Sequence, residues 1–217
     1  MKQTLKNKYV NKHIHVDICK LSKTFHKEVT LINTTIKNEA FVFHTSSTLF
    51  SPDQIDKGTL AMLLFVEFTS TDKVLDLGCG YGVVGIVAAK LIGSRNVVMS
   101  DIQEKAVQIS HQNTLLNDVA DIQIIRSDGF TNIPEKDFSL ILSNPLYHSD
   151  FSVPKHFIEK GFNRLRIGGK MMMVVKRKDW YKKKFIAIFG GVVIQEIDGY
   201  YVFRAEKRSI TYANWKA

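Results

Sequence analysis

The sequence has few of the residues that build disulfides, metal sites or membrane spans. Its only two cysteines, Cys19 and Cys79, form no CxxC pair, and its seven histidines are scattered without an HExxH pattern. Disulfide scaffolds and zinc centres need clustered ligands, so we expect no metal and a reducing setting. The longest apolar run, near residues 60–66, is far below the roughly 20 residues of a membrane helix. We therefore expect a cytoplasmic protein without membrane contact.

Positive charge is scarce in the middle of the chain and abundant at its ends. The net charge is +9, but residues 31–159 hold fifteen acids against nine bases. Residues 160–217 hold fourteen bases against four acids, and residues 1–30 hold seven lysines against two acids. Cations gathered on one face release counterions from a phosphate backbone when they bind it. The basic ends therefore indicate a polyanionic partner such as a nucleic acid, unless they form only a solvated surface.

Strand and helix patterns alternate along most of the chain. Two short strands, 29–36 and 40–44, with a turn expected at Asn38-Glu39, precede a helix that starts near Asp53. The further expected strands are 73–77, 96–100, 122–125, 138–142, 170–175, 192–197 and 200–205. The expected helices between them are 83–92, 104–117, 154–165 and 179–189. This alternation is typical of a mostly parallel sheet covered on both faces, and the closing hairpin adds one antiparallel strand. We predict a β-rich extension over residues 1–50 and one Rossmann-like α/β domain over 51–217.

Glycines crowd the turn that follows the strand 73–77, in the segment Asp76–Gly82. Glycine permits positive φ angles and a close approach of the backbone to a ligand. Gly80, Gly82 and Gly85 also match the dinucleotide pattern GxGxxG, so NAD or FAD is one candidate ligand. Asp76 favours S-adenosylmethionine instead, because a carboxylate suits a cationic aminoacyl group and is awkward beside a pyrophosphate. A turn without any ligand is the third alternative.

Carboxylates also follow the next two strands. Asp101 can accept hydrogen bonds from both ribose hydroxyls of a nucleoside, or it can be the N-cap of the helix 104–117. Asp128 can accept from an adenine amino group, or it can belong to a plain turn. The expected cofactor-binding residues are Asp76, Gly78, Cys79, Gly80, Asp101, Ile102, Asp128, Gly129 and Asn144.

The segment Asn144-Pro145-Leu146-Tyr147 follows the strand 138–142 and predicts the chemistry. Methyl transfer to an exocyclic amine builds positive charge on nitrogen, so neutral acceptors aimed at the amine stabilise the transition state. The Asn144 oxygen and a carbonyl held by Pro145 can serve in this way, and Tyr147 can stack on a base. These three are the expected catalytic residues. The alternative is a plain turn after the strand.

A basic stretch interleaved with aromatic residues follows the strand 170–175. Cations can grip phosphates there, and an aromatic ring can stack an unpaired base. The alternative is a solvated helix face. The expected RNA-binding residues are Lys176, Arg177, Lys178, Trp180 and Lys182.

Taken together, these motifs resemble the methyltransferase small-domain family, and most of all its short single-domain bacterial members. The resemblance covers roughly residues 40–206. It rests on the segments 50–51, 55–59, 74–85, 100–101, 127–128, 143–145, 168–169 and 199–200. It implies a seven-stranded sheet with a reversed last strand, S-adenosylmethionine as methyl donor and guanine N2 of ribosomal RNA as acceptor.

Two positions depart from the family pattern. Leu146 stands where the family usually has a second proline, and Thr48 stands where a glycine is common. Adenine-N6 and protein-glutamine methyltransferases share the Asn-Pro-x-Tyr pattern, so both remain alternatives. An RNA-binding protein that keeps the cofactor but has lost activity is a third. Oligomeric state is not encoded in any motif, and a monomer is favoured.

Overall fold

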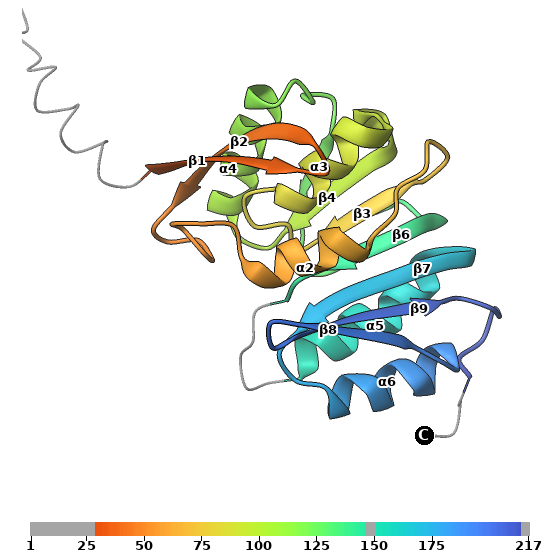
Figure 1. Cartoon of the computed structure of the whole chain (residues 1–217). Coiled ribbons are helices and arrows are strands. Elements are labelled where there is room, and N and C mark those ends of the chain that lie inside the picture. The colour runs from red at the N-terminus through yellow and green to blue at the C-terminus, as the bar shows by residue number, and fades with distance from the viewer. Residues whose placement is uncertain (1–28, 146–150, 214–217) are drawn as a thin grey trace, which may run out of the picture.

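A seven-stranded sheet forms the centre of the computed structural model, which describes residues 29–145 and 151–213 (Figure 1). Its strand order is β5-β4-β3-β6-β7-β9-β8. Only β9 runs opposite to the other six strands, which confirms the predicted Rossmann-like sheet with one reversed strand. The strands of this sheet are β3 (Val74–Leu77), β4 (Val97–Asp101), β5 (Gln123–Arg126), β6 (Phe138–Ser143), β7 (Leu165–Val175), β8 (Val193–Ile197) and β9 (Tyr200–Glu206).

Helices cover both faces of the sheet, and each face has its own hydrophobic core. One core contains buried residues of the three helices within 57–116, and the other contains buried residues of the two helices within 152–189. Figure 1 shows the two sets on opposite sides of the strands. The helices are α2 (Lys57–Phe65), α3 (Val83–Ile92), α4 (Glu104–Leu116), α5 (Ser152–Arg164) and α6 (Asp179–Phe189), with a 3₁₀ turn η1 (Ser94–Asn96) before β4.

The helix α2 begins four residues later than the sequence indicates. Its N-cap is Asp56, whose carboxylate accepts a hydrogen bond from the Thr59 backbone N–H at 2.9 Å. Asp53 is exposed, and Ser51 has a φ of 52°, which a helix does not contain. The prediction of a start near Asp53 is therefore wrong, because Asp56 supplies the cap.

A two-stranded hairpin, β1 (Val29–Ile36) and β2 (Glu39–Ser46), precedes the central domain. The turn residues Lys37 and Asn38 have φ angles of 52° and 67°, so the turn lies one residue earlier than the sequence predicts. Lys37 Nζ also donates a hydrogen bond to the Val66 carbonyl at 2.8 Å. This contact fixes the turn on the central domain.

Two asparagines, one inside α4 and one at its C-cap, pair with the outer edge of β2 as a third strand would. Asn113 accepts from His44 N–H at 2.7 Å and donates to His44 O at 2.8 Å. Asn117, one turn later, makes the same pair of bonds with Val42 at 3.0 and 2.8 Å. Asn113 also donates to Tyr81 O at 2.8 Å. The hairpin and the glycine-rich turn are thus held by one side chain.

Candidate functional site

A cavity of about 330 Å³ opens at the carboxyl edge of the sheet, where β3, β4 and β6 end. This volume lies in the usual range of small-molecule sites. Each expected cofactor-binding residue lines it, and so does Pro145. The expected residues come together because the carboxyl ends of neighbouring parallel strands meet at one edge.

The glycine-rich turn forms the floor of the cavity. The φ angles of Gly78, Gly80 and Gly82 are 76°, 58° and 96°, which favour glycine at these three positions. The N–H groups of Gly78 and Cys79 donate to Ser100 O at 2.8 and 2.9 Å. Burial and the nearby acids raise the pKa of the Cys79 thiol well above its usual range, so the thiol stays neutral.

Asp76 is 2% exposed and ties the turn to the helix that follows. Its Oδ2 accepts from Gly85 N–H, in the first turn of α3, at 2.8 Å. Burial raises the pKa of Asp76 to about 7, against the opposing effect of the Gly85 hydrogen bond. A Cβ at Gly85 would lie 2.3 Å from Met99 Sδ, so the last glycine of GxGxxG has a packing role here.

Asp101 joins the turn to the start of α4 with both carboxylate oxygens. Oδ2 accepts from Gly80 N–H and Oδ1 accepts from Gln103 N–H, each at 2.9 Å. Burial raises the pKa of Asp101, although these N–H groups favour the charged form. The N-cap of α4 is Gln103 and not Asp101, so the alternative N-cap role for Asp101 is wrong. A carboxylate has further acceptor capacity, which leaves room for ribose hydroxyls.

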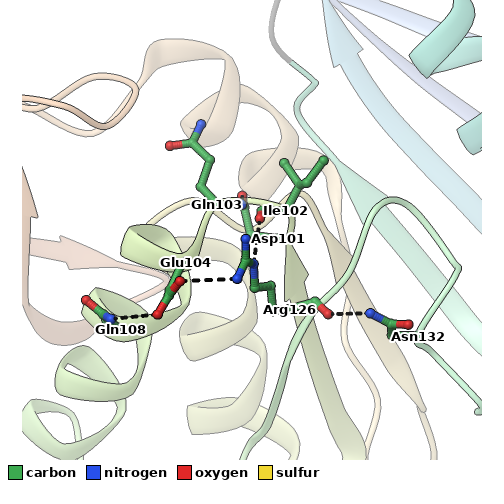
Figure 2. Close-up of polar contacts among 7 residues, drawn as sticks. All are labelled: Asp101, Ile102, Gln103, Glu104, Gln108, Arg126 and Asn132. Carbon is green, nitrogen blue, oxygen red and sulfur yellow. Dashed lines mark hydrogen bonds and ion pairs between the residues drawn. The ribbon is translucent and has the colours of Figure 1, made fainter.

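The loop that carries Ile102 is held from outside by Arg126 (Figure 2). Arg126 donates to Ile102 O at 3.3 Å and to Glu104 Oε2 at 3.1 Å. Its own carbonyl accepts from Asn132 Nδ2 at 2.9 Å. The Ile102 side chain is 57% exposed although it lines the cavity. Such an apolar side chain at the mouth suits the face of a planar ring.

The turn after β5 brings Asp128 and Gly129 to the cavity. Ser127 Oγ donates to Gly129 O at 2.9 Å and accepts from Asn132 N–H at 3.0 Å, which fixes the turn. Gly129 has a φ of 53°, and a Cβ there would lie 3.0 Å from the His156 ring. The Asp128 side chain is exposed at the rim.

These residues fit S-adenosylmethionine. Ser100 Oγ is buried without a hydrogen-bond partner within the described residues, and Ser100 lines the cavity. Such a polar atom is costly to leave unpaired, so it points to a polar ligand. Asp76 and Asp101 supply acidic groups for an ammonium and for ribose hydroxyls, and Phe157 and Ile102 supply apolar walls.

Asn144 lies beside this cavity, directly after β6, and its amide is held by two groups near the start of α2. Its Nδ2 donates to Asp56 Oδ2 at 2.8 Å and to Thr59 Oγ1 at 2.9 Å. Just before it, Ser143 Oγ donates to Leu77 O at 2.7 Å and locks β6 to β3. The expected stacking residue Tyr147 and the unusual Leu146 lie outside the described residues.

Two residues of this network carry no predicted role in the sequence. Asp56 lines the cavity, and its Oδ1 accepts from the Tyr200 hydroxyl at 3.2 Å. Burial and Asp56 both raise the pKa of Tyr200. The family pattern includes both positions, which is the one signal that singles them out; spacing gives none, because they lie far apart in the chain.

The expected RNA-binding residues follow β7 at the same edge of the sheet as Asn144, because Met173 of β7 pairs in parallel with Ser143. We call Lys176, Arg177 and Lys178 the basic cluster; all three are exposed. Lys176 Nζ lies 5.1 Å from the centre of the Tyr200 ring. Lys182 is exposed on α6, whereas Trp180 is half-buried and stacks on Phe151 at 4.4 Å, so one face of its ring is covered.

Residues 29–145 and 151–213 contain neither a metal-site cluster nor a membrane-spanning helix. No group of three or more His, Cys, Asp or Glu side chains in these ranges has the arrangement of a metal site. None of the helices described there is long and apolar enough to span a membrane.

Comparison with known proteins gives consistent matches. A family model, the methyltransferase small domain, matches residues 40–204. The uncharacterized protein YbxB of Bacillus subtilis is 31% identical over 79% of this chain and 89% of its own length. Ribosomal RNA small subunit methyltransferase C of Hamiltonella defensa is 32% identical over 65% of this chain.

A solved structure, the 16S rRNA N2-guanine methyltransferase RsmC of T. thermophilus in complex with AdoMet and guanosine, superimposes with a TM-score of 0.72. It is 26% identical and covers 83% of this chain. This chain spans 43% of the Hamiltonella enzyme and 51% of the RsmC chain. It therefore matches about half the length of these two methyltransferases.

Proposed function

This chain belongs to the methyltransferase small-domain family, whose class I enzymes use S-adenosylmethionine, and we propose that it methylates guanine N2 in ribosomal RNA. The observation that carries the proposal is the Asn144 amide, held beside the cavity by Asp56 and Thr59. Support for the acceptor comes from RsmC, whose structure contains guanosine and AdoMet.

The cofactor supplies a methyl group on a positively charged sulfur, which leaves as a neutral sulfide. The chain has to hold the donor, orient the acceptor amine and keep water away. Asp76, Asp101 and the glycine-rich turn would hold the donor, with Asp128, Gly129 and Ile102 at the adenine end. Cys79 stays a neutral part of the wall.

Asn144 would accept a hydrogen bond from the exocyclic amine and direct its lone pair toward the methyl group. Positive charge builds on the amine nitrogen during transfer, and a fixed amide oxygen stabilises it. Pro145, buried at the next position, would restrict the backbone that follows. Tyr147 stays a prediction for base stacking. The methylated amine then loses a proton to water, so no dedicated base is required.

The basic cluster would bind the RNA backbone next to the site. Its three cations are exposed at the edge of the sheet where Asn144 lies, so bound phosphates would lie near the acceptor base. Lys182 would extend this surface along α6. Trp180 would offer a base the ring face that Phe151 does not cover.

The test is methyl transfer from tritiated S-adenosylmethionine to ribosomal RNA that lacks its modifications, followed by nucleoside mass spectrometry. The wild type should yield N2-methylguanosine. Asn144→Ala should slow transfer by about 100-fold, as the loss of one preorganised polar group does in other enzymes. Asn163→Ala, at an exposed asparagine of α5, is the matched control and should transfer like the wild type. Equal rates for the wild type and Asn144→Ala would refute the role of Asn144, and absence of transfer would favour an RNA-binding protein without activity.

A further inference from the structure

The carboxylate of Asp56 has more partners than a helix cap requires. Capping of α2 uses one bond, from Thr59 N–H to Oδ2 at 2.9 Å. The same oxygen also accepts from Asn144 Nδ2 at 2.8 Å, and Oδ1 accepts from the Tyr200 hydroxyl at 3.2 Å. Asp56 therefore connects three segments of the chain: the start of α2, the end of β6 and the start of β9.

The partners of Asn144 fix which end of its amide faces the protein. A carboxylate only accepts hydrogen bonds, so the amide atom that faces Asp56 is the NH₂ group. Both hydrogens of that group have partners, one in Asp56 and the other in Thr59 Oγ1 at 2.9 Å. The orientation of the amide oxygen is set by these two bonds.

A charged acceptor also changes the amide electronically. Hydrogen bonds to an ionised group are shorter and stronger than neutral ones, and bonds in a chain polarise one another. The negative carboxylate at the NH₂ end shifts electron density toward the amide oxygen. That oxygen then becomes a better acceptor for a group that gains positive charge.

Tyr200 holds Asp56 in place from the other side. A Cβ at Gly58 would lie 2.7 Å from two carbons of the Tyr200 ring, so the ring lies close against the first turn of α2. Lys176 Nζ lies 5.1 Å from the centre of the same ring. Tyr200 thus contacts both Lys176, the first residue of the basic cluster, and the Asp56 carboxylate that holds Asn144.

We propose that Asp56 is a positioning residue, which orients and polarises the Asn144 amide toward the acceptor amine. This inference rests on the proposed function, because it assigns Asn144 to the methyl acceptor. Asp56 acts through Asn144, so its contribution should disappear once Asn144 is removed. A residue that only caps α2 would not behave in this way.

The variant Asp56→Asn separates the two roles. Asparagine caps helices about as well as aspartate, so the fold should be kept, while the negative charge is lost. We expect kcat to fall by at least about tenfold, since catalytic groups depend on exact orientation. The KM for RNA and the affinity for S-adenosylhomocysteine should stay within about twofold of the wild-type values. Polarisation of the Asn144 amide acts on the transition state and not on the binding of either ligand. Asp53→Asn is the matched control, because it removes the same charge from an exposed site three residues earlier, and it should leave kcat unchanged.

The double variant Asp56→Asn/Asn144→Ala completes a thermodynamic cycle. We expect it to be as slow as Asn144→Ala alone. Two independent losses that multiply in the double variant would overturn the proposal, and so would a kcat of Asp56→Asn equal to that of the wild type.

A measurement without RNA keeps this inference separate from the proposed function. The side-chain amide signal of Asn144 can be assigned in ¹⁵N NMR spectra as the pair missing in Asn144→Ala. In Asp56→Asn its two proton shifts should move, and its exchange with water should quicken by about tenfold or more, as expected when a charge-assisted hydrogen bond is lost. If the signal is unchanged, Asp56 does not position Asn144. If the signal changes but the wild type methylates no RNA, the proposed function fails while the positioning stands.

Discussion

Replacing Asn113 by alanine should weaken both the fold and cofactor binding, because this side chain joins the hairpin to the glycine-rich turn. Asn113 is 0% exposed and makes three side-chain hydrogen bonds. Two of them hold the N–H and carbonyl of His44, and the third holds the carbonyl of Tyr81. Tyr81 lines the cavity, one residue after Gly80.

The magnitude follows from these three bonds. At about 1 kcal/mol for each bond, the loss is about 3 kcal/mol, and groups left unpaired in the interior increase it. In a chain of this size 1 kcal/mol changes the Tm by about 2–4 °C, so the Tm should fall by about 6–12 °C. The affinity for S-adenosylhomocysteine should also fall, because the Tyr81 backbone loses its support.

The assay compares three alanine variants by thermal unfolding and by calorimetry with S-adenosylhomocysteine. Asn117→Ala loses the bonds to Val42 but none to the glycine-rich turn, so it should lose stability and keep ligand affinity. Gln112→Ala, at an exposed position of the same helix, should change stability by less than about 0.5 kcal/mol. A stable Asn113→Ala, or equal ligand affinity in both asparagine variants, would refute the coupling.

Three further predictions concern the glycine-rich turn, Asp76 and the basic cluster. Gly85→Ala should cost about 1–3 kcal/mol in urea unfolding, because its Cβ would lie 2.3 Å from Met99 Sδ. The double variant with the buried Met99 also changed to alanine should lose less stability than the two single variants added together. Burial raises the pKa of Asp76 from 3.8 to about 7, so the folded protein keeps a proton that the unfolded chain releases, and stability should fall as pH rises from about 4 to 7. Asp76→Asn should remove that fall between about pH 4 and pH 7; a fall of the same size in the variant would contradict the assignment. Neutralising the three residues of the basic cluster should make the plot of log K for RNA binding against log salt concentration less steep by about 2. Each phosphate contact on a single strand contributes about 0.7 to this slope. The control neutralises three exposed cations near the opposite edge of the sheet, which are Arg166, Lys170 and Arg208. An equal effect of this control would contradict a local RNA surface.

Much of the fold and of the cavity can be predicted from the sequence, because both follow from short-range patterns. Alternating strands and helices predict a parallel sheet, and the residues directly after its strands must gather at one edge. Asp76, Asp101 and Asn144 were placed in this way. The α3 and α6 helices have the predicted bounds, 83–92 and 179–189.

Contacts between distant segments could not be predicted in this way. Asp56 and Tyr200 are 144 positions apart, and nothing in their local sequence shows that their side chains meet. The start of α2 was misplaced for the same reason, since Asp53 and Asp56 are equally good caps and tertiary partners favour Asp56. The hairpin turn was shifted by one residue, where Lys37 has a long-range bond to Val66. The boundary near residue 50 and the roles of the individual site residues stay predictions.

The most direct test of the central claim is nucleoside mass spectrometry of ribosomal RNA incubated with the purified protein and S-adenosylmethionine. The account predicts N2-methylguanosine that depends on both the cofactor and Asn144. Another methylated nucleoside, or methyl transfer to protein glutamine with none to RNA, would contradict the proposed acceptor. Binding of NAD with no binding of S-adenosylhomocysteine would contradict the account as a whole.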